Sequence, residues 1–163
     1  MSEEEPLVDQ KPGQQTRVNG NWHTLSLSSS NIEKIQENGP LRMYFREIQC
    51  DEDCHQMSYR LYTKTDGLCQ EQTATTSGEE DGIYSIKFAG DNIYEILLLK
   101  DGIIVFDNLN VDESGLTTRG IFVLGQRDSL TPDEVQWLEE VNKERGIPEE
   151  NIIYFSGTDD CPE

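Results

Sequence analysis

The chain has 163 residues, with 13 lysines and arginines against 32 aspartates and glutamates, so its formal net charge is −19 at pH 7. Nucleic acids and anionic membranes are bound through basic surfaces, and this charge therefore excludes both as the main partner. Apolar residues make up 34% of the chain in short runs only. Because a membrane-spanning helix needs about 20 consecutive apolar residues, we predict no membrane insertion.

The ends of the chain differ from its middle in composition. Residues 1–15 carry charge, proline and glycine but almost no core material, and we predict a flexible acidic tail there. Residues 16–163 are expected to form a single domain. The start of the chain has neither the basic stretch nor the apolar run of a secretory signal, so the protein is either cytosolic or a mature form whose signal has been removed.

Alternation of apolar and polar residues predicts the first strands. An extended run covers Trp22–Leu27, and residues 31–37 are expected to form a brief helical turn. In the next strand Leu41, Met43 and Phe45 share one face. The alternation fails at residues 46–47, where continuing it would bury a glutamate, and we predict a β-bulge there.

Further strands follow at even spacing. The pattern predicts them near residues 57–61, 68–75, 84–88, 92–99, 103–108 and 118–124, separated by turn signals such as Asp66-Gly67. About eight strands joined by short turns favour an antiparallel up-and-down β-barrel, which leaves room for one small ligand. We therefore predict an all-β fold with one flanking α-helix.

The helix is predicted because one part of the sheet has apolar residues on its second face as well. The residues concerned are Leu97, Leu99, Ile103, Val105, Ile121 and Val123. The segment from Thr131 to Glu134 has the pattern of a capping box with proline at the first helical position. The helix should cover residues 131–145, bury Val135, Leu138 and Val141, and be followed by a short strand over 152–155.

The four cysteines are Cys50, Cys54, Cys69 and Cys161, which allow three pairings. A bridge between Cys50 and Cys54 requires a tight turn, and the acidic residues between them suit one. The remaining pair would close a loop of 93 residues (161 − 69 + 1) and fasten the end of the chain. Zinc binding by Cys50, Cys54, His55 and Cys69 and free thiols in a reducing compartment are the alternatives.

Several motifs resemble the lipocalin family, and within it the odorant-binding and aphrodisin-like lipocalins of mammals. Gly20-Asn21-Trp22 matches the Gly-x-Trp of the first strand, and residues 108–112 approximate the second motif. The third motif usually has an arginine before the helix, whereas this chain has Gln126 there and Arg127 beside it. Segments 33–40, 145–152 and 159–162 extend the resemblance over nearly the whole chain beyond the tail.

The resemblance implies a secreted, oxidised carrier of small volatile hydrophobic molecules such as odorants or pheromones. It implies disulfides 50–54 and 69–161, and structural roles for Gly20, Trp22 and Arg127, with Trp22 as a plug. An olfactory receptor is a further candidate partner, and a monomer and a weak homodimer both remain open. No glycosylation sequon occurs in the chain.

Alternation alone gives the set of side chains that point toward the barrel axis, which is the predicted ligand site. Apart from two tyrosines, which are neutral near pH 7, the set contains no ionisable group, and we therefore expect neutral ligands such as aldehydes, alcohols and terpenoids. The set is Leu27, Leu41, Met43, Phe45, Tyr59, Leu61, Ile86, Phe88, Asn92, Tyr94, Ile96, Phe106, Asn108, Phe122 and Leu124.

Other interpretations of the same residues are open. The apolar interior of a small barrel can simply be a filled core. A lipocalin-type enzyme would need a free thiol inside the barrel, and a fatty-acid carrier would need an arginine there. Asn108, Asn110 and Asp112 are spaced like calcium ligands, but Glu113 replaces the required glycine. The sequence has no catalytic or phosphate-binding motif, and we predict no enzymatic activity, no cofactor and no metal.

Overall fold

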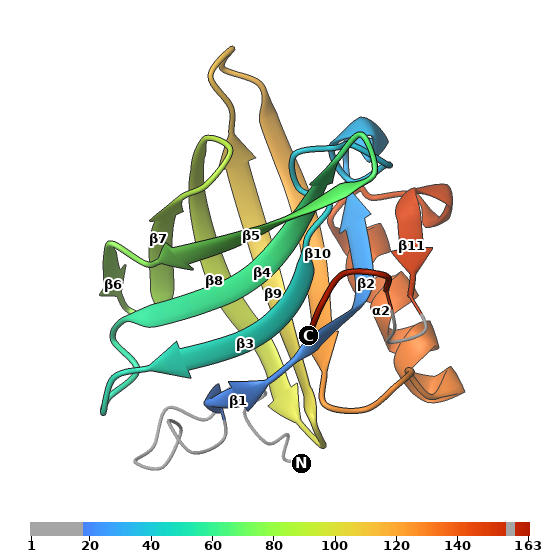
Figure 1. The fold of residues 1–163 in the computed structure, drawn as a ribbon. Coiled ribbons are helices and arrows are strands. Elements are labelled where there is room, and N and C mark those ends of the chain that lie inside the picture. Colours follow the sequence, from blue (N-terminus) through green and yellow to red (C-terminus); the bar gives the residue numbers. More distant parts are fainter. Residues whose placement is uncertain (1–17, 156–158) are drawn as a thin grey trace.

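Two antiparallel sheets curve around a shared interior (Figure 1). The computed structural model describes residues 18–155 and 159–163, so the tail predicted for residues 1–15 lies outside the described residues. The first sheet has the order β1 (Gly20–Asn21), β3 (Tyr44–Cys50), β4 (Met57–Thr65), β5 (Leu68–Thr75). The second has the order β11 (Ile152–Tyr154), β2 (His23–Ser29), β10 (Thr117–Gly125), β9 (Ile103–Val111), β8 (Asp91–Lys100), β7 (Ile83–Lys87), β6 (Gly78–Glu80).

The sheets are joined along both sides. On one side β1 and β2 form one run of chain that changes sheet at Trp22, whose amide donates to the carbonyl of Arg46 at 2.9 Å. Next to it the Thr24 hydroxyl donates to the Met43 carbonyl at 2.8 Å. On the other side the Thr76 amide donates to the Met57 carbonyl at 2.8 Å, just before the chain enters β6. The predicted all-β barrel with a flanking helix is confirmed.

Bulges decide which residues face inward. The bulge predicted at residues 46–47 is present, since the register of β3 against β4 shifts between Phe45 and Glu47. A second register shift, between Ile96 and Leu98 of β8, was not predicted. Beyond it Leu99 packs in the interior cluster, so the expectation that Leu99 faces outward was wrong. An extra residue reverses the phase of all residues after it, and simple alternation cannot anticipate this.

The helix α2 (Pro132–Glu144) packs on the outer face of the second sheet. Its capping box is formed as predicted, because Thr131 accepts from the amide of Glu134 and Glu134 accepts in return. Leu138 and Val141 are buried, but Val135 is only half-buried. The third buried position is Asn142, which accepts a hydrogen bond from Ser28 Oγ at 2.6 Å. No helix among the described residues has the length and apolarity needed to cross a membrane.

Two short 3-10 helices complete the fold. The turn predicted near residues 31–37 is η1 (Ile32–Lys34), and η2 (Glu149–Asn151) precedes β11. Gly39 must be glycine where the chain doubles back, because a Cβ atom there would lie 2.4 Å from the carbonyl oxygen of Lys34.

Trp22 closes one end of the barrel with 1% of its surface exposed. Its indole N–H donates to the Val18 carbonyl at 2.7 Å, and Gly20 before it has φ of +141°, which favours glycine. Arg127 does not take part in this plug. Its guanidinium instead hydrogen-bonds both carboxylate oxygens of Glu134, so it fastens the helix start to the end of β10. The side chain that lies next to Gly20 is that of Gln126, not that of Arg127.

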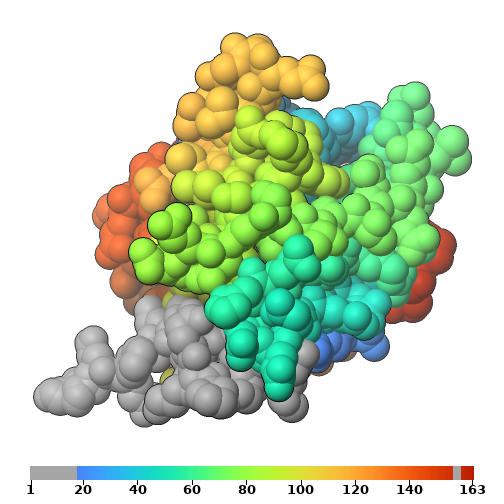
Figure 2. Space-filling model, turned by 90° about the vertical axis from the view of Figure 1, so that its left-hand side faces the viewer, coloured from blue at the N-terminus to red at the C-terminus, as the bar shows by residue number. Residues whose placement is uncertain are grey.

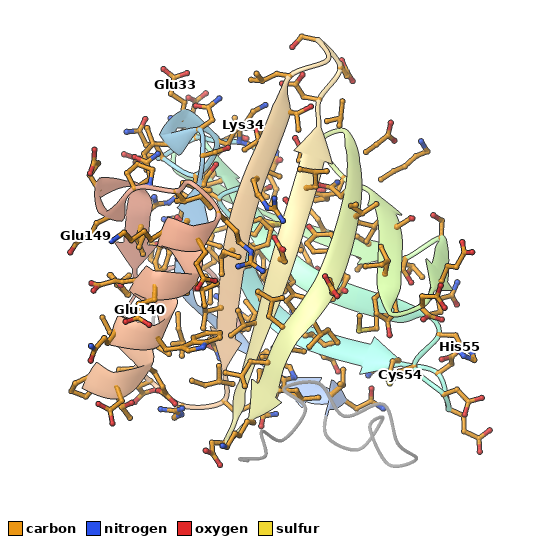
Figure 3. The ribbon with its side chains drawn as sticks, turned by 180° about the vertical axis from the view of Figure 1, so that it is seen from behind. Glu33, Lys34, Cys54, His55, Glu140 and Glu149 are labelled. Carbon is orange, nitrogen blue, oxygen red and sulfur yellow. A yellow bond between two sulfur atoms is a disulfide. The ribbon has the colours of Figure 1, made fainter. Side chains whose placement is uncertain are left out.

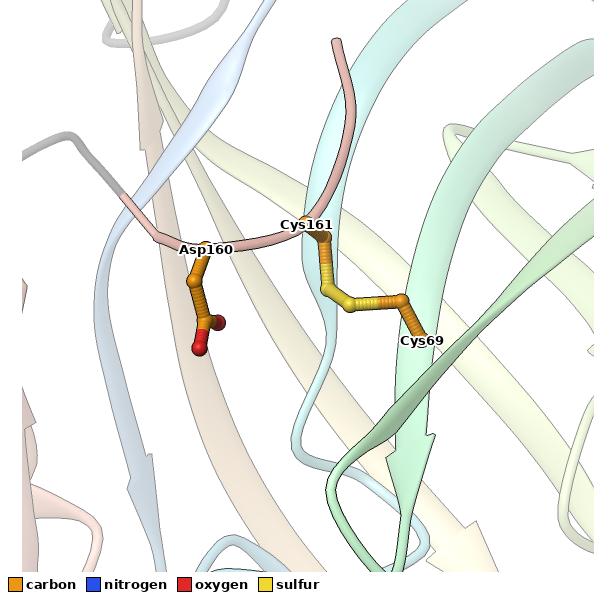
Figure 4. Close-up of side chains that lie close together, drawn as sticks. All are labelled: Cys69, Asp160 and Cys161. Atoms are coloured by element: carbon orange, nitrogen blue, oxygen red, sulfur yellow. A yellow bond between two sulfur atoms is a disulfide. The ribbon is translucent and has the colours of Figure 1, made fainter.

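The end of the chain is fastened to the outer side of the first sheet. Both predicted disulfides, Cys50–Cys54 and Cys69–Cys161, are formed in the structure. Figure 4 shows the second, with the Asp160 side chain beside it. Since all four cysteines are paired, none can serve as a thiolate ligand, and the zinc alternative is wrong.

A buried arginine reinforces this attachment. Arg46 has only 2% of its surface exposed, and its guanidinium pairs with Asp159 and donates to the carbonyls of Cys161 at 3.0 Å and Pro162 at 2.7 Å. It also lies 5.2 Å from the centre of the Tyr62 ring. The bulge in β3 therefore turns Arg46 outward, where it holds the tail.

We expect Arg46→Met to lower the free energy of unfolding by about 3 kcal/mol, because it leaves the carboxylate of Asp159 and two carbonyls without their buried donor. Arg60→Met on the neighbouring strand is the matched control. Arg60 forms partly exposed ion pairs with Glu47 and Glu71, and its loss should cost less than about 1 kcal/mol. Urea denaturation of both variants measures the difference, and equal costs would contradict the role given to Arg46.

Candidate functional site

A small apolar cavity lies between the two sheets. Side chains of β3, β4 and β5, with Met43 just before β3, form one wall. Side chains of β7 to β10, with Phe88 just after β7, form the other. The lining residues are Met43, Phe45, Tyr59, Leu61, Ala74, Ile86, Phe88, Tyr94, Phe106 and Phe122. Nine of these ten were predicted from alternation. Ala74 was missed because it stands between two threonines in a strand that looked polar throughout.

The wall of the cavity carries no charge. None of the ten lining side chains is acidic or basic, and the buried Arg46 points to the outer side of the sheet. Burial raises the pKa of Tyr59 and of Tyr94 well above the ordinary tyrosine value, so both phenols are neutral donors at physiological pH. The cavity therefore presents a neutral and mostly aromatic surface.

The aromatic rings nearly fill the interior. Tyr94 lies 5.9 Å from Phe106 and 6.0 Å from Phe122, while Tyr59 lies 5.7 Å from Phe45, all measured between ring centres. The remaining cavity volume is about 10 Å³, which is room for one water molecule. The predicted room for one small ligand is therefore absent in this conformation, and a ligand can enter only when side chains of the wall rotate.

A layer of asparagines lies beside the cavity and not in its lining. The Asn92 amide donates to the Phe88 carbonyl at 2.8 Å, and its oxygen accepts from Asn108 at 3.1 Å and Asn110 at 2.9 Å. The side-chain oxygens of Asn108 and Asn110 are buried without a hydrogen-bond partner in the described part of the chain. Asn92 and Asn108 were predicted to contact ligand, but here they bond to the backbone and to each other.

The other predicted ligand contacts are core residues. They are buried in the same interior cluster as the cavity walls but do not line it, and they are Leu27, Leu41, Ile96 and Leu124. Leu41 belongs to the segment that covers one end of the barrel. They therefore face the interior as predicted, although they do not line the cavity.

One end of the barrel is covered by the segment that includes η1. Ile35 and Leu41 from this segment are buried in the interior cluster. A salt bridge of 2.7 Å between Lys34 Nζ and Asp112 Oδ2 ties the segment to the β9–β10 turn, and the Asp66 amide donates to Asn38 Oδ1 at 3.1 Å. Figure 3 places Lys34 and Cys54 at opposite ends of the barrel.

The end at Cys54 is closed by the disulfide turn. The Tyr84 hydroxyl donates to the carbonyl of Cys54, and burial raises the pKa of Tyr84 to about 12. Gln56 donates to the Thr76 carbonyl at 3.2 Å. Figure 2 shows this face, on which the turn at residues 50–57 lies beside the β6–β7 hairpin. This end is held by many contacts, so the opposite end is the better entrance.

Two open hollows on the outer face of β8 and β9 are larger than the cavity, at about 260 and 130 Å³. Both share Ile93 and Leu109. Charged residues surround them, including the ion pair of Lys87 with Asp91. A small apolar molecule bound there would remain exposed to solvent, and we therefore place the candidate site in the interior.

The sequence of this chain matches a family of known proteins and several of its members over most of its length. Residues 19–159 match the sequence model of the Lipocalin / cytosolic fatty-acid binding protein family. An odorant-binding protein of Phodopus sungorus is 39% identical over 145 residues, which cover 89% of this chain and 96% of that protein. A female-specific lacrimal gland protein of Mesocricetus auratus is 38% identical over 146 residues, covering 90% and 84%.

Solved structures of lipocalins also resemble this one over most of the chain. The crystal structure of aphrodisin, described as a sex pheromone from female hamster, has a TM-score of 0.86 at 38% identity and covers 90% of this chain and 99% of that one. Bovine odorant-binding protein in complex with undecanal has a TM-score of 0.65 at 29% identity, covering 93% and 94%.

We predict that Asp112→Asn loosens the segment over the barrel end, with faster hydrogen exchange of the amides of residues 32–42. Asp91→Asn, which removes the exposed ion pair with Lys87, is the control and should leave that exchange unchanged. If both variants behave alike, the salt bridge of Lys34 with Asp112 does not hold the segment.

The same salt bridge should withstand moderate acid. The hydrogen bonds from Lys34, from the Ser114 hydroxyl and from the Leu116 amide hold the pKa of Asp112 well below its ordinary value. A carboxyl group with a lowered pKa contributes stability above its unfolded pKa of about 3.9 and loses it only as the pH falls through the lower folded value. Lowering the pH to about 4 should therefore leave this salt bridge intact, and its loss should not speed the hydrogen exchange of the amides of residues 32–42 in that range.

Proposed function

This chain belongs to the lipocalin family, and we propose that it is a secreted carrier which binds small, neutral, hydrophobic molecules, odorants or pheromones, inside the barrel. The observation that carries the proposal is the lining of the cavity, which is apolar and aromatic and has no charged side chain. A charged ligand would be buried there without a counter-charge, at a cost of several kcal/mol. Aldehydes, ketones, esters, alcohols and terpenoids carry no such cost.

The filled interior is compatible with a carrier if its side chains rotate. Phe88 is half-buried and follows β7 directly, so its ring can swing toward solvent without displacing a strand. Met43 lines the opposite wall, and the three rotatable bonds of methionine let it adapt to different shapes. We therefore expect broad specificity, with affinities in the micromolar range because part of the burial energy opens the site.

Secretion is proposed on the disulfides and on the relatives. Both disulfides persist in oxidising compartments and are rare in the cytosol. A relative at 38% identity is named for the lacrimal gland, a tissue that secretes fluid. The high negative charge keeps such a protein soluble and disfavours non-specific contact with anionic surfaces.

The competing functions are less well supported. An enzyme with a pocket thiol would need a free cysteine, and all four cysteines of the chain form disulfides. A carrier of fatty-acid carboxylates would need a basic group in the cavity wall, and Arg46 faces the tail instead. Delivery to an olfactory receptor, the choice between monomer and weak homodimer, and the single domain over residues 16–163 stay predictions.

An apolar fluorescent dye should bind the protein with micromolar affinity and should be displaced by neutral aldehydes. A carboxylic acid of the same chain length should compete at least about 10-fold less well, since its charge would be buried unpaired. Phe88→Ala should change the affinity of the dye, whereas Leu68→Ala should not, because Leu68 is 70% exposed outside the barrel. Equal competition by acid and aldehyde would contradict the neutral site.

A further inference from the structure

The cavity has a small and defined set of polar groups. Among the ten lining residues only Tyr59 and Tyr94 carry a hydroxyl, and only Met43 carries a sulfur atom. Tyr59 comes from β4 in one sheet and Tyr94 from β8 in the other, and their ring centres lie 6.5 Å apart. Two phenol groups on facing walls are therefore the polar groups that a molecule in this cavity meets.

The hydroxyl of Tyr94 forms no hydrogen bond within residues 18–155 and 159–163, and only 7% of the residue is exposed. Its oxygen is not one of the fully enclosed unpaired atoms of the described residues, so solvent can still reach it when the cavity holds no ligand. The hydroxyl of Tyr59 donates only to the sulfur of Met57, at 3.9 Å, and a thioether is a weak acceptor. A bound molecule that displaces solvent from this hydroxyl leaves a donor without an acceptor unless the molecule supplies one itself. Of the two tyrosines, Tyr94 is the one without a protein acceptor among the described residues.

The asparagine layer cannot supply these donors in place of the tyrosines. The side-chain N–H groups of Asn92 donate to backbone carbonyls, among them that of Phe88. Those of Asn108 and Asn110 donate to the oxygen of Asn92. The unpaired atoms of this layer are the side-chain oxygens of Asn108 and Asn110, which are acceptors, and these two residues do not line the cavity.

We propose that Tyr94, assisted by Tyr59, makes this cavity selective for ligands that carry a carbonyl oxygen, namely ketones, aldehydes and esters. The inference rests on the proposed carrier function and narrows it. A carbonyl oxygen accepts from a phenol and brings no donor of its own. An alcohol must also bury its own O–H group, and the oxygens in the lining that can accept from it are those of the two phenols, which are weaker acceptors than a carbonyl. The unpaired amide oxygens of Asn108 and Asn110 lie outside the cavity lining.

The rings hold these hydroxyls in place when the ligand changes. Tyr94 packs against Phe106 and Phe122, and Tyr59 packs against Phe45 and Phe106 in edge-on geometry. Apolar burial thus supplies most of the affinity, and the phenols discriminate among molecules of similar shape.

The test uses three ligands of one shape: a methyl ketone, the alkene in which a methylene group replaces its oxygen, and the secondary alcohol. Each displaces an apolar fluorescent dye from the full chain. The ketone should bind about 3- to 10-fold more tightly than the alkene, the range expected for one neutral hydrogen bond, and more tightly than the alcohol.

Tyr94→Phe should abolish the advantage of the ketone while the alkene keeps its affinity, which also shows that the variant is folded. Tyr59→Phe should reduce that advantage by less. Tyr62→Phe is the matched control, because Tyr62 packs outside the barrel against the tail and should leave all three affinities unchanged.

The outcomes separate the two proposals. If the dye does not bind the wild-type protein, the carrier function itself fails. If dye and ligands bind but ketone and alkene bind equally, or the alcohol binds best, carbonyl selectivity is wrong while the carrier function stands. If Tyr94→Phe weakens ketone and alkene alike, or only Tyr59→Phe removes the advantage of the ketone, the assignment of Tyr94 is overturned.

Discussion

The alternation of side chains across curved sheets is the constraint on which the rest of this structure depends. Each strand sends every second side chain into a space that two sheets share, so a few positions per strand decide the chemistry of the whole interior. In this chain those positions hold apolar, aromatic and amide groups, and no basic residue of the described part of the chain lines the cavity. The neutral interior and the strongly acidic exterior are two results of one pattern.

Bulges adjust that pattern where it would otherwise fail. At Arg46 the extra residue sends a guanidinium outward, and the tail of the chain then covers it and pairs with it through Asp159. At Leu97 a second bulge brings Leu99 into the interior and leaves Leu97 and Leu98 against the helix side. The first could be predicted because it avoids burying Glu47. The second could not, since every residue around it is apolar and either phase looks acceptable.

The sequence predicted the strands, the helix cap and nine of the ten cavity-lining residues, because these follow from local periodicity and turn chemistry. It did not predict which of the interior residues line the cavity, and Leu27 and Leu124 are buried in the interior without doing so. Nor could it predict the volume left between the rings, since that depends on rotamers of Tyr59, Tyr94 and Phe106 that are chosen jointly. Asn142 was missed because a single polar residue in an apolar stripe gives no sign of its partner, Ser28.

The attachment of the tail has a consequence for the lifetime of the protein. Cys161 is joined covalently to β5, and Arg46 donates hydrogen bonds to the carbonyls of Cys161 and Pro162. Local unfolding of this segment would therefore have to break the buried contacts of Arg46 and would still leave Cys161 joined to β5, so fraying cannot spread from there into the strands. An unfolding protease that needs a loose segment to begin would find none in residues 159–163.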